Sequence, residues 1–511
     1  MKTTRFLCVL MALMMLMSCT ALAESSSAIT NVPDATVSML AMNSWYSTVD
    51  LSDAELLNEV QRRANVKIEW NLIDPTIYAD TVSPMLANGQ DLPDIIELPD
   101  TDSNMKYLST GMFVKLDEYF EIMPNYTKFL DENPIIKASL TAPDGHIYYV
   151  PQTVVTSSYQ PVLMINRLWL EKLGLETPST LDEFVDMLRA FRDNDMNDNG
   201  DTTDEIPMSI QASFLPYMFG PAFGLDLVSG FYADEEGVVH YGPYESEAYR
   251  AYLTFLHDLF EEGLLEMEFA SLDRDQTTAR CANDLTGVTY DFSWQMSNLY
   301  SANHPAYTGE EGVFVGVPPL SGEHAGFYVG RTPVSGVFGV NTKAADVELA
   351  VKFLDYAMGE EAQDLYVWGM EGLTYEVDAD GNRHFLPKTT EDALWFQGLG
   401  INAPNMPSQQ STPATDVLLP AWHVQAVREM EEPYAHDPFP AVYSTEDEAS
   451  IISMYLVDLT TYVDERAMAF IRGTASLETD FDSYLATLQG LQVEELIKVK
   501  QDQYDRYAGA M

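Results

Sequence analysis

The sequence predicts an α/β protein of two lobes with a helical C-terminal region. At 511 residues the chain is longer than one hydrophobic core normally supports, so two large lobes are expected. Strand-like and helix-like stretches alternate near the N-terminus, which is typical of an α/β lobe built on a parallel sheet. From about residue 445 onward the spacing of apolar residues is helical.

The first two hundred residues carry the clearest local signals. We expect strands at 37–42, 66–70, 94–98 and 161–165, and helices at 53–65 and through Met85. A capping box from Thr180 to Glu183 opens a helix whose apolar face is core, formed by Phe184, Met187, Leu188 and Phe191. Ligands of parallel sheets bind beyond the carboxyl ends of the strands, so segments 43–46 and 99–102 are candidate binding loops.

An acidic loop after this helix has the spacing of a calcium site. Oxygen ligands on alternate residues wrap around one cation, Gly200 permits the turn, and a late carboxylate can bind in bidentate fashion. The predicted ligands are Asp195, Asn197, Asn199, the main-chain carbonyl of Asp201, Asp204 and Glu205. The EF-hand pattern places its last carboxylate where Ile206 stands, so the match is partial, and a solvated acidic turn is the alternative.

The charge balance restricts the ligand. Twenty-seven Lys and Arg stand against 79 Asp and Glu, for a net charge of −52. Such a chain is repelled by nucleic acid and by anionic membranes, and a neutral ligand suits it better than a polyanion.

The N-terminus has the features of an export signal. Lys2 and Arg5 precede an apolar run from Phe6 to Met17 that is too short to span a bilayer. Residues 16–19 resemble a lipobox with Cys19 as the lipidated residue, whereas residues 21–23 resemble an ordinary cleavage site. We favour lipidation because residues 25–34 then form a polar tether. Of the three cysteines, Cys8 and Cys19 lie in this leader, which leaves Cys281.

No catalytic motif stands out. The chain has no G-x-S-x-G, no phosphate-binding glycine loop and no H-E-x-x-H. A carbohydrate-active enzyme with two cleft carboxylates remains an alternative, because 79 acidic residues make such pairs uninformative. A lipoprotein that binds peptides is a third possibility.

Aromatic residues beside turns suggest a sugar site. Apolar sugar faces pack on aromatic rings, and Trp45, Tyr46, Tyr159, Trp294, Trp368 and Tyr375 all lie next to turn or polar residues. We expect ligand contact for Trp45 and Trp294 in particular. For Phe214, Tyr217 and Trp422 a core role is preferred.

Several stretches together resemble the extracellular solute-binding proteins of ABC importers, in the family-1 group that includes oligosaccharide binders. The resemblance is carried by residues 143–151, 165–175, 178–184, 205–207, 352–356, 369–372 and 504–507. It implies two α/β lobes of the periplasmic-binding-protein type II, joined by crossing hinge strands, that close on a ligand. The chain also resembles alginate-binding relatives with a calcium loop, whose acidic pair lies one residue earlier than Asp204 and Glu205.

The resemblance also implies lobe boundaries and site residues. The expected N-terminal lobe is 33–160 and 317–375, and the expected C-terminal lobe, with its helical tail, is 161–316 and 376–511. From the N-terminal pattern described above, residues 1–23 are the predicted signal peptide, of lipoprotein type if cleaved before Cys19. The expected ligand-binding residues are Asn43, Trp45, Tyr46, Asp100, Thr101, Tyr159, Trp294, Gln295, Arg331, Trp368 and Glu371.

We therefore expect a monomeric receptor that captures a neutral oligosaccharide and delivers it to a membrane permease, without catalysis. It would be lipid-anchored at the cell surface, or free if cleaved after Ala23. Calcium would be a structural ion.

Overall fold

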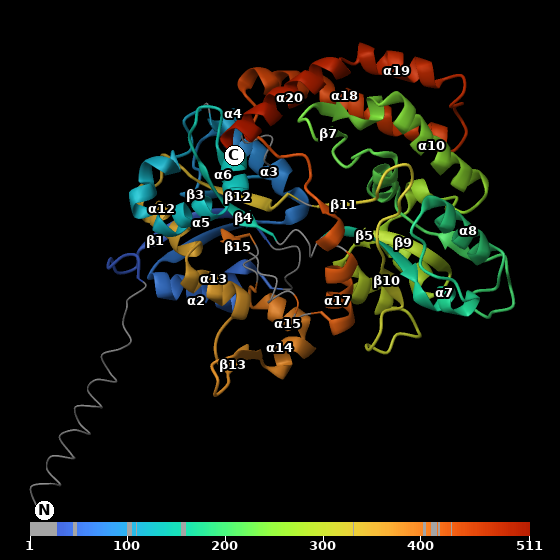
Figure 1. Ribbon diagram of the computed structural model, residues 1–511. Helices are drawn as coiled ribbons and strands as arrows, with labels where there is room; N and C mark the ends of the chain where they lie inside the picture. Colours follow the sequence, from blue (N-terminus) through green and yellow to red (C-terminus); the bar gives the residue numbers. More distant parts are fainter. Residues whose placement is uncertain are drawn as a thin grey trace, which may run out of the picture.

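A computed structural model describes most of the chain. The residues described are 28–43, 49–99, 105–108, 110–154, 160–330, 332–401, 405–409, 416, 419–430 and 432–511. Figure 1 shows two α/β lobes beside one another, with a set of C-terminal helices lying across both.

The first lobe is built on a six-stranded mixed sheet. Its order is β15 (Ser408–Gln409), β4 (Tyr149–Thr153), β12 (Val334–Val340), β3 (Ile95–Glu97), β1 (Thr36–Met42) and β2 (Lys67–Ile73). Strand β1 runs parallel to β2 and β3, whereas β12 runs antiparallel to β3 and β4. The expectation of a parallel sheet therefore holds for β1, β2 and β3 and is wrong for β12, which arrives from a distant part of the sequence.

The helices of the first lobe bury the apolar faces of this sheet. They are α2 (Glu55–Ala64), α3 (Tyr78–Asn88), α4 (Met105–Leu108), α5 (Pro124–Glu132), α6 (Pro134–Leu140), α12 (Val347–Ala357) and α13 (Glu360–Trp368). The fully buried Tyr126 of α5 donates its hydroxyl hydrogen to the main-chain oxygen of Tyr149 at 2.6 Å. Its own N–H donates to Asp355 of α12 at 2.9 Å, so one residue joins a helix to both the sheet and a second helix.

The second lobe has a four-stranded sheet in the order β10 (Phe314–Gly316), β5 (Pro161–Asn166), β9 (Thr286–Phe292) and β6 (Ile206–Met208). Its longer helices are α7 (Arg167–Leu173), α8 (Leu181–Arg192), α10 (Ser246–Glu261) and α11 (Arg274–Ala282). The capping box of α8 is confirmed, because the Glu183 N–H donates to Thr180 Oγ1 at 3.2 Å and the Thr180 N–H donates to Glu183 Oε2 at 3.3 Å. The predicted apolar face is buried over its whole length, and each such side chain contributes about 1.5–3 kcal/mol.

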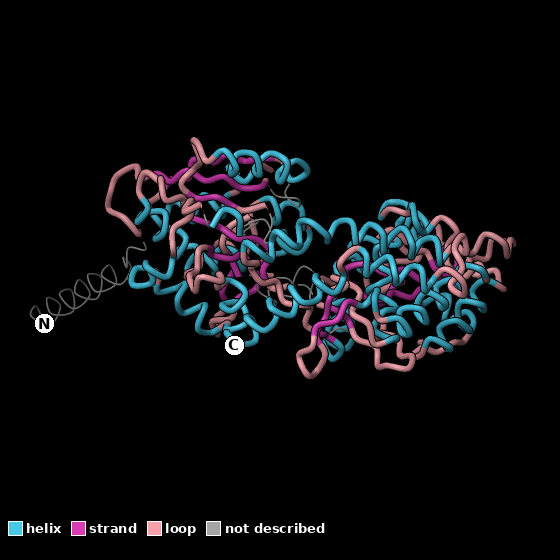
Figure 2. Tube along the Cα trace, turned by 90° about the horizontal axis from the view of Figure 1, so that it is seen from above, coloured by secondary structure: helices cyan, strands magenta, loops and turns pink. Residues whose placement is uncertain are grey.

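The chain crosses between the lobes at one place. Strand β4 leads into β5, and the return path runs through β11 (Tyr328–Val329) into β12. The two crossings are bonded to each other, because the Val154 N–H donates to the Pro333 oxygen at 2.9 Å. Strand β11 pairs in parallel with β16 (Ala435–His436), which brings a third segment to the same place. Seen from above, the molecule is two masses joined at a narrower waist (Figure 2).

The C-terminal helices brace the second lobe and reach the first. They are α18 (Glu446–Ile471), α19 (Phe481–Gly490) and α20 (Val493–Ala510), and they lie across the top of Figure 1. Helix α18 packs on α10, α20 packs on β8 (Val239–Tyr241), and both also contact first-lobe helices, α4 and α6 respectively. Arg506 of α20 holds Glu448 of α18 through two hydrogen bonds of 2.6 and 2.7 Å.

Residues 376–409 form a satellite of the first lobe. They contain β14 (Arg383–Phe385), which pairs with β13 (Tyr375–Val377), and two short helices, α14 (Pro387–Glu391) and α15 (Ala393–Gly398). Phe396 and Ile401 pack against Leu56 of α2, and β15 pairs with β4. Part of the 376–511 segment thus lies against the first sheet, and the lobe boundaries given above stay a prediction. Within the described part of the chain, no helix combines the length and the apolarity needed to cross a bilayer.

Candidate functional site

One edge of the first sheet faces the second lobe. Strands β1 and β3 are parallel and end there, at Met42 and Glu97. Strand β4 ends and β12 begins at the same edge, because Thr153 pairs with Val334. Both of these strands connect directly to the second lobe, so this end of the sheet faces that lobe. It is the position where open α/β sheets bind their ligands.

Asn43, which follows β1, has a structural role in the loop that leaves this edge. Its N–H donates to the Ile73 oxygen at 2.8 Å, and its Oδ1 accepts the Leu51 N–H at 3.2 Å. The side chain of Asn405 also donates to the Met42 oxygen. These bonds tie Asn43 to the end of β2 and to Leu51, and tie Asn405 to the end of β1.

The second lobe contributes the end of β9. Asp291, fully buried, accepts two hydrogen bonds from Arg274 of α11, at 2.7 and 2.8 Å, and one from the Tyr300 hydroxyl at 2.7 Å. Tyr300 belongs to a π-helical turn, Met296–Ser301, a form that is frequent at functional sites. Trp294 and Gln295 lie half-buried between this anchored strand end and the turn.

Gln160 is a residue that sequence reasoning missed. It is fully buried where the chain enters the second lobe, and its main-chain oxygen accepts the Ser293 N–H at 2.9 Å. Neither its amide oxygen nor its amide nitrogen has a hydrogen-bond partner within the described residues. A buried amide without partners is costly unless a ligand or water completes it.

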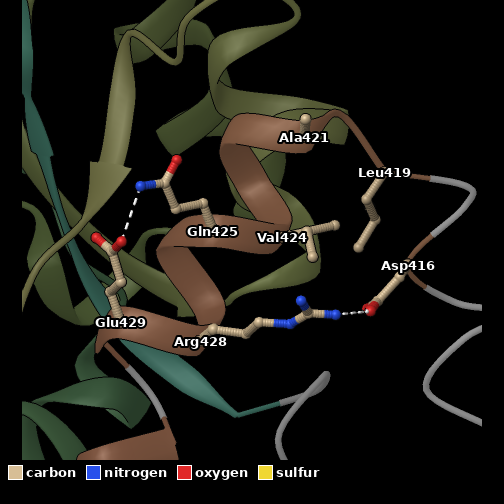
Figure 3. Close-up of a pocket in the computed structure, with 7 residues that line it drawn as sticks. All are labelled: Asp416, Leu419, Ala421, Val424, Gln425, Arg428 and Glu429. Carbon is tan, nitrogen blue, oxygen red and sulfur yellow. Dashed lines mark hydrogen bonds and ion pairs between the residues drawn. The ribbon is translucent and has the colours of Figure 1, made fainter.

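A pocket of ≈ 540 Å³ lies against α17 (Ala421–Met430) and was not predicted either. Figure 3 shows its seven lining residues, which are Asp416, Leu419, Ala421, Val424, Gln425, Arg428 and Glu429. Arg428 forms an ion pair with Asp416 at 2.7 Å. On the other side of α17, Trp422 packs over Gly312, beside β10. The core role expected for Trp422 agrees with this packing, and Phe214 is buried in the same lobe.

The predicted calcium loop is folded on itself by its own side chains. Asp195 Oδ2 accepts the Gly200 N–H at 2.9 Å, and Glu205 Oε1 accepts the Met196 N–H at 2.7 Å. The turn needs positive φ at two positions, Asp198 with 60° and Gly200 with 85°, and glycine adopts this at the least cost. Asp198 points away, to Lys172 Nζ at 2.6 Å.

Three carboxylate oxygens of this loop suit a cation. Asp195 Oδ1, Asp204 Oδ1 and Glu205 Oε2 are buried and have no hydrogen-bond partner in the part of the chain that the structure describes. Burial, together with the nearby charges of Asp204 and Asp195, raises the pKa of the Glu205 carboxyl. Among the described residues, no group of three or more Asp, Glu, His or Cys side chains is close enough together to hold a metal ion. A cation would therefore also need the amide and main-chain oxygens of the loop, as calcium commonly does.

Comparison with known proteins decides the family. The model of the bacterial extracellular solute-binding proteins matches residues 50–364. The chain belongs to this family.

Among curated relatives, the fructooligosaccharide ABC transporter substrate-binding protein FusA of Streptococcus pneumoniae is 27% identical over 506 residues, covering 92% of this chain and 90% of FusA. The structure of FusA with kestose matches with a TM-score of 0.75, at 23% identity, over 93% of this chain and 100% of FusA. A human-milk-oligosaccharide (HMO) binding protein of Bifidobacterium longum infantis matches with a TM-score of 0.77, at 21% identity, over 93% of this chain and 99% of that protein. Other matched structures include an EF-hand mutant of FusA and the alginate-binding protein AlgQ2 without calcium.

Several predicted ligand residues of this family member lie outside the described residues. These are Trp45, Tyr46, Asp100, Thr101, Tyr159 and Arg331. The lipidation candidate Cys19 also lies outside the described residues. Of the others, Asn43 lies at the facing edge of the first sheet, and Trp294 and Gln295 follow β9.

Trp368, the last residue of α13, and Glu371 lie next to the satellite. The Trp368 ring stacks on Phe385 at 4.8 Å, and the Arg383 guanidinium lies 5.5 Å from its centre. Glu371 is exposed and adjoins Tyr375 in an isolated bridge. Their ligand roles stay predictions, and the contacts described for Trp368 are those of a hairpin core.

The Asp291 anchor gives a testable expectation. Replacing Arg274 by alanine leaves a buried carboxylate with fewer donors, so the free energy of unfolding should fall by about 3 kcal/mol in denaturant titrations. Arg189→Ala is the matched control, because its ion pair with Glu262 is exposed on both sides and should be worth less than about 1 kcal/mol. Equal effects of the two changes would show that the anchor contributes no more than a surface pair.

Proposed function

We propose that the protein is the substrate-binding component of an ABC transporter and captures a neutral oligosaccharide between its two lobes. The main supporting observation is that the strand ends of the first sheet and the end of β9 in the second lobe meet where the chain crosses between the lobes. The chain also aligns with FusA over 92% of its length. Two of the similar proteins support an oligosaccharide as the ligand, namely FusA with kestose and the HMO-binding protein of Bifidobacterium longum infantis. The net charge of −52 favours an uncharged ligand over the acidic sugars of the alginate-binding protein.

The mechanism proposed is closure. A sugar that contacts the carboxyl edge of the first sheet and Trp294 of the second lobe stabilises the closed state, because it gains contacts only when both lobes surround it. No bond in the sugar is broken, and the permease receives the ligand unaltered. A cleft enzyme would instead release a cleaved product.

The export features complete the proposal. Family membership supports a location outside the cytoplasmic membrane, and lipidation of Cys19 would hold the receptor near a permease. Cleavage after Ala23 would release it instead. A monomer suffices, since both walls of the cleft come from one chain.

Trp294 is the first residue to test. Trp294→Ala should weaken binding of kestose, or of whichever neutral oligosaccharide binds, by at least about tenfold in calorimetry, which corresponds to about 1.4 kcal/mol. The reason is the loss of a flat apolar surface for the sugar ring. Trp70→Ala is the control, because Trp70 lies in β2, an outermost strand of the first sheet. Unchanged affinity in the Trp294 variant, with the fold intact, would remove Trp294 from the site.

Calcium at the 195–205 loop is the second part of the proposal. The unpartnered oxygens of Asp195, Asp204 and Glu205 would become ligands, and the ion would neutralise their mutual repulsion. Two relatives support this, since one matched structure is an EF-hand mutant and another is a calcium-free form. The ion is structural in this proposal and takes no part in binding sugar.

Calcium should therefore raise the thermal transition of the protein. At a hundred times the dissociation constant the gain is about 2.7 kcal/mol, enough to move the melting temperature by several degrees. Glu205→Gln should abolish the shift, whereas Asp198→Asn should keep it, because Asp198 points to Lys172. If chelation leaves the wild-type transition in place and metal analysis finds no bound calcium, the loop is only an acidic turn.

A further inference from the structure

A polar notch lies in the sheet edge that faces the second lobe, and the function proposed above does not use it. Strand β12 is irregular there, with a register shift between Val334 and Gly336. Gly336 pairs with Gln152 of β4, and two residues further along β12 Phe338 pairs with Glu97 of β3. Side chains two apart on a strand share a face, so Glu97 and Gln152 flank the missing side chain of Gly336 on the same face.

The distances confirm this arrangement. A Cβ at residue 336 would lie 3.7 Å from Glu97 Oε1 and 3.7 Å from Gln152 Oε1. These are ordinary van der Waals contacts, so the space of one methyl group is open between a carboxyl and an amide. The hydroxyl of Ser335, on the exposed side of the bulge, lies within donating distance of both the Gln152 main-chain oxygen, at 3.3 Å, and Gln152 Oε1, at 3.4 Å. Bulges of this kind are common next to binding sites.

Glu97 is an unusual residue for the end of a central strand. It is only 3% exposed, and its Oε2 accepts the Met42 N–H at 2.7 Å. The side chain thereby replaces the main-chain acceptor where the pairing of β1 with β3 stops. This anchoring needs one oxygen and no charge, and a glutamine would provide it equally well. The second oxygen, Oε1, is the one beside Gly336.

We propose that this notch is a hydroxyl-binding subsite of the cleft, in which a hydroxyl of the bound sugar enters at Gly336 between the Glu97 carboxyl and the Gln152 amide. The inference rests on the function proposed above and assigns residues that sequence reasoning did not select. In its neutral form the Glu97 carboxyl both donates and accepts hydrogen bonds, which matches a hydroxyl group. In its ionised form it only accepts.

The surroundings of Glu97 favour the neutral form. Burial raises its pKa to about 8, and the Met42 N–H only partly offsets this. Strands β1 and β12 carry no acidic or basic side chain, and β4 carries only Tyr149, whose position alternates to the opposite face. From α3, Tyr78 donates to the Glu97 main-chain oxygen at 2.8 Å, and burial keeps the pKa of Tyr78 far above its usual range. Asp100, three residues along the chain, lies outside the described residues.

The sign of the pH dependence follows. Below pH 8 the carboxyl is protonated and can donate to the sugar. Above pH 8 it loses this proton, and a buried anion faces the hydroxyl. Affinity should therefore be constant from pH 6 to pH 7.5 and fall about tenfold by one to one and a half units above the pKa.

Two variants separate shape from protonation. Gly336→Ala fills the notch without backbone strain, because Gly336 has no positive φ and the added methyl meets no close contact. It should lower affinity at all pH values by about tenfold or more. Glu97→Gln keeps an acceptor for Met42 and a donor for the sugar but cannot ionise, so it should bind at pH 7 within a few-fold of the wild type and lose the alkaline fall. Gly490→Ala, a glycine of α19 with nothing within 4 Å of the added methyl, is the control.

The experiment is a calorimetric titration of the full-length protein with kestose and a panel of neutral oligosaccharides at pH 6.5, 7.5 and 9. The proposal is supported if Gly336→Ala weakens binding, Gly490→Ala does not, and only the wild type and Gly490→Ala lose affinity at pH 9. It is overturned if Gly336→Ala binds as the wild type does, or if the wild type and Glu97→Gln have the same pH profile. If the wild type binds no neutral oligosaccharide at any pH, the proposed function itself fails, a result distinct from the other two.

Discussion

The placement of β12 is the constraint on which the two-lobe structure depends. This strand comes out of the second lobe and enters the middle of the first sheet, between β3 and β4. The first sheet therefore takes one of its middle strands from beyond the second-lobe segment of the sequence, so the two lobes are not separate stretches of chain. The same insertion brings the start of β12 to the edge where β1 and β3 end, so one topological feature creates both the hinge and one wall of the cleft. The bonded crossing segments Val154 and Pro333 keep that wall close to the second lobe.

Burying a carboxyl group costs free energy unless its surroundings compensate, and three buried carboxyl groups of this acidic chain have different surroundings. Asp291 is paired with Arg274, which donates two hydrogen bonds to this buried side chain in the second lobe. Glu97 has no cationic partner in the surroundings described above, and burial shifts it toward the neutral acid. Glu205 shares its loop with Asp195 and Asp204 and leaves an oxygen unpartnered, which an ion would relieve. The first arrangement anchors a strand end, and the other two underlie the proposed hydroxyl-binding subsite and the proposed calcium loop.

Much of the fold could be predicted because its signals are local. The capping box at Thr180 and the apolar face from Phe184 to Phe191 are contained in twelve residues, and the structure has both. The strands at 37–42 and 94–98 were equally predictable, since short apolar runs bounded by turn residues need no distant partner to be recognised. The direction of β12 was not predictable in this way, because it depends on residues far away in the sequence.

The site was predicted less completely, for the same physical reason. Trp294 could be selected because it directly follows a strand. The notch at Gly336 has no local signature, since its walls come from β3 and β4 and its floor is an absent side chain. The α17 pocket depends on the ion pair between Asp416 and Arg428, which the sequence does not reveal. Trp368 was selected because it lies near a turn, and the sequence could not show that the β13–β14 hairpin places Phe385 against its ring.

The most direct test of the account is small-angle X-ray scattering of the mature protein with and without a saturating neutral oligosaccharide, followed by recovery of the sugar. Closure of two lobes about one crossing point predicts a smaller radius of gyration in the bound state and a sugar recovered intact. A sugar that binds without changing the radius of gyration, or that is recovered cleaved, would contradict the account.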